Sequence, residues 1–116
     1  MQSKARAIIA LAILASLISF AKFSHCESSV WATPDQYIHA CYSDIPALYG
    51  ERGLSKGQWA YSNGAESVEY PVVTGAVMWA LAYITPNDDD AVRNYFNINI
   101  FFIALLLILT ALIIYK

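Results

Sequence analysis

The chain has 116 residues, of which 58% are hydrophobic and 14% are charged, and its formal net charge is −2. A soluble domain usually has about 25% charged residues, so this composition disfavours an ordinary soluble fold. The slight negative charge also argues against nucleic acid as a partner. Uncharged residues gather in long runs, which predicts an all-α membrane protein with two or three transmembrane helices.

The first hydrophobic run predicts a helix over residues 7–23. It is short for a hydrocarbon core of about 30 Å, although its basic flanks can reach outward to the interface. A retained transmembrane anchor and a secretory signal cleaved after Ala21 both fit, and both send the next loop across the membrane. Because Lys4 and Arg6 precede the run, the positive-inside rule places residues 1–6 in the cytoplasm.

Residues 24–70 form a predicted extracytoplasmic loop rich in acidic and aromatic residues. The loop is too short and too polar for a core of its own, so it should fold against the membrane helices and the lipid interface. Its Trp and Tyr side chains are typical of interface anchors. A sharper interpretation is that some of them stack on sugar rings or line a groove for a lipid headgroup.

A short helix is predicted within this loop, at about residues 44–53. Ser43 or Asp44 can cap it, Pro46 suits its first turn, and Gly53 suits the position after its end. Its apolar residues share one face at helical spacing: Ile45, Leu48 and Tyr49. The pattern predicts a juxtamembrane amphipathic helix that lies along the membrane surface.

Cys26 and Cys41 are the two cysteines, and they stand fifteen residues apart in the same loop. A disulfide is one interpretation on an oxidising face, but free thiols are favoured because nothing else in the loop looks cross-linked. His25 and His39 stand near them, at a spacing unlike that of zinc sites. No metal and no cofactor is therefore predicted.

The middle apolar run, residues 71–86, is marginal in length for a crossing. A short tilted transmembrane helix is favoured, and a re-entrant or interfacial helix is the alternative. If the run crosses, the polar loop 87–97 is cytoplasmic. If it only dips into the membrane, this loop is outside and Lys116 is inside, which the positive-inside rule prefers. The last run, residues 98–115, is long and apolar enough for a transmembrane helix.

Two carboxylates are the candidates for catalysis, Asp44 and Glu69. A carboxylate at a membrane surface can accept a proton from a hydroxyl nucleophile. Each also has a structural explanation, since Asp44 can cap its helix and Glu69 can complement the positive end of the helix that follows. The candidates for substrate binding are the neighbouring tyrosines: Tyr42, Tyr49 and Tyr70.

Three stretches carry a resemblance to a known family: Cys-Tyr-Ser-Asp-Ile-Pro-Ala-Leu-Tyr-Gly-Glu-Arg-Gly-Leu (41–54), Glu-Tyr-Pro-Val-Val-Thr-Gly-Ala-Val-Met-Trp (69–79) and Tyr-Phe-Asn-Ile-Asn (95–99). With the basic N-terminus and first helix, they resemble the N-terminal part of bacterial membrane proteins of the glycosyltransferase family 87 type. These belong to the C superfamily of enzymes that use polyprenyl-phosphate sugars.

The resemblance implies a multi-pass helical fold in the inner (plasma) membrane and a lipid-linked sugar as donor, often mannose or arabinose. The acceptor would be an envelope glycan or lipid. It also implies that an acidic residue of the first outer loop acts at the transfer site, with Asp44 the better match and Glu69 the second. Asn97 stands where an Asp is expected, and family members are several hundred residues long. The chain therefore looks truncated and is not expected to be active alone, but to need further membrane helices from a partner chain. The alternative is a small membrane-anchored interaction or structural protein of the cell envelope, without catalytic activity.

Overall fold

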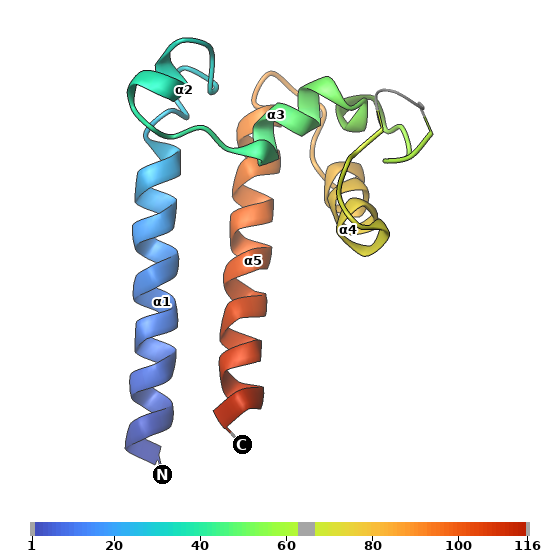
Figure 1. Ribbon diagram of the computed structural model, residues 1–116. Helices are drawn as coiled ribbons and strands as arrows, with labels where there is room; N and C mark the ends of the chain where they lie inside the picture. Colours follow the sequence, from blue (N-terminus) through green and yellow to red (C-terminus); the bar gives the residue numbers. More distant parts are fainter. Residues whose placement is uncertain (1, 63–66, 116) are drawn as a thin grey trace.

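The computed structural model describes residues 2–62 and 67–115, and within them it contains helices and no strands. Figure 1 shows two long helices standing side by side, with a smaller head at one end that contains the shorter helices between them in the chain. The elements in chain order are α1 (Gln2–Ser24), α2 (Asp35–Ile38), α3 (Asp44–Glu51), the 3₁₀ helix η1 (Leu54–Lys56), α4 (Val72–Tyr83) and α5 (Ala91–Tyr115).

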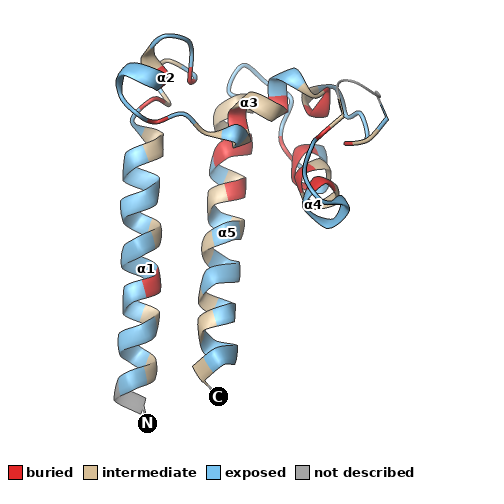
Figure 2. Cartoon of the chain, viewed as in Figure 1, coloured by how far each residue is buried: buried red, intermediate tan, exposed pale blue. Residues whose placement is uncertain are grey.

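Helices α1 and α5 are both long and apolar enough to cross a membrane. At 1.5 Å per residue, the 23 residues of α1 extend about 34 Å and the 25 of α5 about 37 Å. Only 6% of the most apolar window of each helix is buried, and Figure 2 shows their surfaces exposed along most of their length. Exposed Leu and Ile side chains on both helices suit lipid as the surrounding medium, so the predicted all-α membrane fold is confirmed.

Helix α5 begins at Ala91, seven residues before the predicted start at residue 98. The predicted polar loop 87–97 was therefore wrong over most of its length. Asp88 Oδ1 accepts hydrogen bonds from the Asp90 backbone N–H at 3.0 Å and from the Asn94 side chain at 3.3 Å. Carboxylates just before a helix can accept hydrogen bonds from free N–H groups, and they interact favourably with the positive end of the helix dipole. A polar first turn can therefore be helical.

Helix α3 lies across the head end of α5, and its cap and end confirm the predicted short helix. Ser43 Oγ accepts a hydrogen bond from the Ile45 N–H at 3.3 Å. Gly53 takes the left-handed backbone that ends the helical segment, with φ of 73°. The apolar face packs on α5, where the rings of Tyr49 and Tyr95 stack at 4.3 Å. The head is thus held on the end of α5 by a small aromatic core.

Helix α4 has 12 residues, so it is about 18 Å long and too short for a hydrocarbon core of about 30 Å. In Figure 1 it is seen almost end-on beside α5, which is seen from the side, so the two axes cross steeply. Its exposed side chains are apolar at both ends, with Val73 78% and Tyr83 74% exposed. This length and direction favour the interfacial alternative over a tilted crossing.

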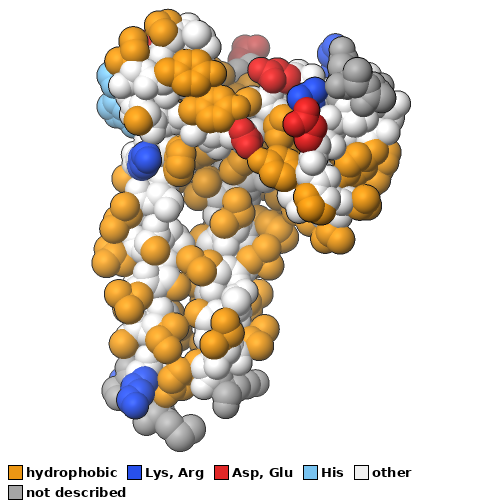
Figure 3. Space-filling view, viewed as in Figure 1, with side chains coloured by type: hydrophobic (Ala, Val, Ile, Leu, Met, Phe, Trp, Pro, Cys, Tyr) orange, Lys and Arg blue, Asp and Glu red, His pale blue; other side chains and the backbone are white. Residues whose placement is uncertain are grey.

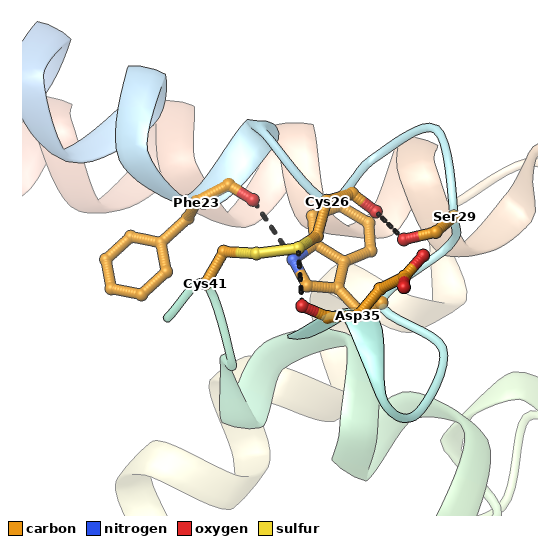
Figure 4. The surroundings of a disulfide bond; sticks show 6 residues. Phe23, Cys26, Ser29, Asp35 and Cys41 are labelled. Carbon is orange, nitrogen blue, oxygen red and sulfur yellow. Dashed lines mark hydrogen bonds between the residues drawn. A yellow bond between two sulfur atoms is a disulfide. The ribbon is translucent and has the colours of Figure 1, made fainter. Parts of the chain in front are cut away.

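A disulfide joins Cys26 to Cys41, so the preference for free thiols was wrong. The turns after α1 and helix α2 fold the chain back until the two Cα atoms are 6.1 Å apart. Figure 4 shows the bond between Cys26 and Cys41. The Trp31 indole is buried in the same cluster, and its Nε1 donates to the Phe23 carbonyl at 3.1 Å. Trp31 also packs on Phe96 of α5, with ring centroids 4.4 Å apart. The two cysteines stand fifteen residues apart in the sequence, and this spacing alone does not show that the fold brings them together.

Candidate functional site

Asp44 lies at the start of α3 with two tyrosines around its exposed carboxylate. The Tyr70 hydroxyl donates a hydrogen bond to Asp44 Oδ2. A hydrogen bond to Asp44, together with partial burial, raises the pKa of Tyr42 from 10.0 to about 12. The same contact with Asp44 raises the pKa of Tyr70 above its ordinary value. Both phenols therefore stay protonated and act as donors at neutral pH.

A polar cavity of about 370 Å³ lies beside this carboxylate. It is lined by Tyr42, Asp44, Leu48, Glu51, Arg52, Glu69 and Tyr70. Arg52 forms an ion pair with Glu69 at 3.2 Å, and the cavity lining contains three carboxylates and one guanidinium group in all. Such a lining offers many acceptors to hydroxyl groups and is unfavourable for a phosphate placed directly in it.

An apolar groove of about 380 Å³ lies on the other side of Asp44 and Tyr70, between α4 and α5. Beyond these two residues and Ile45, it is lined by Val73, Thr74, Val77, Met78, Asn99, Phe102, Ile103 and Leu106. Asp44 and Tyr70 therefore form the border between a polar cavity and an apolar groove. A ligand with a polar head and a hydrocarbon tail matches this arrangement.

The position of Tyr70 depends on a close contact between Tyr61 and the start of α4. The Tyr61 hydroxyl lies 2.9 Å from the Tyr70 carbonyl and 3.0 Å from the Pro71 carbonyl, and it can donate to either. Its ring lies against the bare Cα of Gly75, where an added Cβ would stand 2.8 Å from Cε2 of the ring. Glycine is needed here for close approach, not for its backbone freedom.

Four of the five predicted site residues come together: Tyr42, Asp44, Glu69 and Tyr70 all line the polar cavity. Tyr49 does not join them, because it is 3% exposed and stacks on Tyr95 in the core. Among the cavity residues, Glu51 and Arg52 were not predicted. Glu51 stands seven residues after Asp44, so helical spacing already placed both on one face.

The fold and the site define a class of protein: two helices of membrane length that carry a disulfide-linked head, in which a carboxylate separates a polar cavity from an apolar groove. No family model matches the sequence, and no curated protein and no solved structure matches it either. The resemblance to family 87 glycosyltransferases therefore stays a prediction from the three quoted sequence stretches.

Proposed function

We propose that this protein binds a polyprenyl-phosphate-linked sugar at the outer surface of a bacterial inner membrane, as part of an envelope glycosyltransferase. The observation that carries the proposal is the position of Asp44, where the polar cavity meets the apolar groove. The sugar would occupy the polar cavity and the first isoprene units the groove. The phosphate between them would lie at the mouth of the groove, on the Tyr70 side and away from the three carboxylates.

The charge distribution and the disulfide support an outer position for the head. All nine acidic residues of the chain lie between Glu27 and Asp90. Lys4 and Arg6 stand at the far end of α1, and Figure 3 shows basic side chains there and acidic ones on the head. The positive-inside rule then puts the N-terminus in the cytoplasm, and a disulfide is expected in an oxidising compartment. We propose that α1 is a retained anchor, because it packs along α5.

Asp44 is the proposed general base for transfer. The acceptor hydroxyl would give its proton to the Asp44 carboxylate while its oxygen bonds to the anomeric carbon of the sugar. The bond between the sugar and the phosphate would break, and its electron pair would leave with the polyprenyl phosphate. Tyr42 and Tyr70 would hold the carboxylate in place. Glu69 is the second candidate, but its ion pair with Arg52 suits it better to a positioning role.

We do not expect transfer by this chain alone. The groove between α4 and α5 has exposed residues along its rim, including Val73 and Ile103. Further membrane helices from a partner chain would complete it, in keeping with the multi-pass fold of the family it resembles. Sugar transfer should therefore depend on both chains and on Asp44.

Binding of a short-chain polyprenyl-phosphate mannose to the protein in lipid nanodiscs tests the proposal. Loss of a charged hydrogen-bond acceptor in Asp44→Asn should weaken binding by about tenfold or more. Asp89→Asn, which changes an exposed carboxylate outside the cavity, is the matched control. Equal binding by all three proteins would refute the proposal. Transfer that survives both Asp44→Ala and Glu69→Ala in the presence of the partner chain would remove the catalytic role.

A second candidate function is docking on a larger envelope complex without catalysis. The observation that favours it is an aromatic cluster at the edge of the head, where the rings of Trp59 and Trp79 meet at 5.3 Å and those of Trp79 and Tyr83 at 5.9 Å. Trp59 and Tyr83 are exposed. Crosslinking in native membranes that yields only monomer would count against this function.

A further inference from the structure

A second polar cavity, of about 510 Å³, lies between the disulfide-linked segment and α3. Its residues include Thr33, Gln36, Tyr37, Tyr42 and Glu51. Two of them, Tyr42 and Glu51, also line the cavity around Asp44, so they form a wall between the two cavities. This second cavity belongs to the head and is separate from the apolar groove, with which it shares no residue.

Two exposed tyrosine rings line the second cavity. Tyr37 and Tyr42 are stacked, with ring centroids 5.6 Å apart and planes 12° from parallel. They are nevertheless well exposed, at 61% for Tyr37 and 42% for Tyr42. The stack holds both rings in a defined direction, and the disulfide at Cys41, directly before Tyr42, limits the movement of the backbone that carries them. An aromatic surface of this kind is already ordered before a ligand arrives.

The remaining lining selects for hydroxyl groups. Gln36 is 9% exposed, and its Nε2 donates to Thr33 Oγ1 at 3.2 Å. Glu51 supplies a carboxylate acceptor, and the Tyr37 hydroxyl can donate and accept, whereas the Tyr42 hydroxyl, which donates to Asp44, can accept. None of the residues described around this cavity is basic, which disfavours a phosphate or a carboxylate ligand.

We propose that this second cavity binds a neutral saccharide that carries no lipid. A sugar ring presents an apolar face, which can stack on the outer face of Tyr37, and a rim of hydroxyls for Glu51, Gln36 and Thr33. A hydrocarbon tail has no place here because the surface of this cavity is mainly polar and shares no residue with the apolar groove. The saccharide would be a segment of an envelope glycan that reaches the head from the aqueous side.

The wall that the two cavities share, Tyr42 and Glu51, gives the second cavity a role in the proposed sugar transfer. A saccharide held against Tyr42 and Glu51 would have its hydroxyls next to the cavity that contains Asp44, as the acceptor in sugar transfer requires. This acceptor role rests on the proposed transfer function, whereas the binding of a saccharide rests on the cavity alone.

Saturation-transfer NMR with α-1,6-linked mannobiose, on the whole protein in nanodiscs, tests the inference. The wild type should show saturation transfer. Tyr37→Ala should weaken binding by about tenfold through loss of the ring, while Tyr37→Phe keeps most of it. Ile38→Ala removes a similarly exposed side chain of the same helix outside the cavity, and it should bind like the wild type.

Val73→Asp separates this inference from the proposed function. It places a charge in the apolar groove and outside the second cavity, so it should weaken binding of the lipid-linked mannose and leave mannobiose binding unchanged. Mannobiose that fails to bind the wild type, or that binds Tyr37→Ala with wild-type affinity, would overturn the second site even if lipid-linked mannose binds as proposed. Mannobiose binding that depends on Tyr37 would support the second site even if the lipid-linked sugar fails to bind.

Discussion

Removing the disulfide should loosen the segment that leads into the site. The change is the double variant Cys26→Ser, Cys41→Ser, at two positions that are 2% and 0% exposed. The bond closes a loop with a sequence separation of 15 residues. Closing a loop of that length removes chain entropy worth about 3 kcal/mol from the open state. At about 1.4 kcal/mol for each factor of ten, its loss should increase local opening by roughly 100-fold.

Hydrogen exchange measured by mass spectrometry in nanodiscs reads this opening directly. Amides of residues 26–43 should exchange roughly 100-fold faster in the double variant, if exchange occurs through local opening. Amides in the middle of α5, such as residues 103–109, should be unchanged and serve as the internal control. Wild-type protein treated with a reductant should behave like the variant. An increase below about threefold would refute the view that the cross-link holds this segment.

The other predictions concern the glycine contact and the tyrosine at the site. Gly75→Ala should destabilise the head by about 1–3 kcal/mol, because the added methyl displaces the Tyr61 ring. Gly50→Ala is the matched control: it has open space around it in α3 and should stabilise the helix by about 0.5–1 kcal/mol, so equal thermal shifts would contradict the contact. The pKa of Tyr42 is raised from 10.0 to about 12, so its contribution to stability is present below about pH 10 and is lost as the pH rises toward 12. Absorbance titration of the tyrosines should show the ionisations of Tyr42 and Tyr70 move toward pH 10 in Asp44→Asn, and an unchanged titration would contradict their contacts with Asp44.

The long helices were predictable because a membrane span depends on local composition. The short helix α3 was predictable for a related reason, since Ser43 and Gly53 act on backbone groups within a few residues. The start of α5 at Ala91 was not predictable in this way. Its first turns are polar and interrupt the apolar run. The helix forms there because Asp88 stabilises the turn that leads into it and Tyr95 is buried against Tyr49 of α3.

The site was only partly predictable because its contacts join distant parts of the chain. Asp44 and Tyr70 are 26 residues apart, and Arg52 and Glu69 are 17 apart. Residue type alone identified Asp44, Glu69 and two tyrosines as candidates, but it could not separate Tyr49, which the α3–α5 packing buries. Likewise, the pairing of Cys26 with Cys41 depends on the fold of the turns between them.

Photocrosslinking tests the central claim most directly, with a polyprenyl-phosphate mannose that carries a diazirine on its first isoprene unit. If the lipid occupies the groove next to Asp44, crosslinks in native-like membranes should fall on residues 70–78 and 99–106 and be reduced in Asp44→Asn. Crosslinks that spread evenly along α1 and the C-terminal half of α5, and that are the same in Asp44→Asn, would contradict the account.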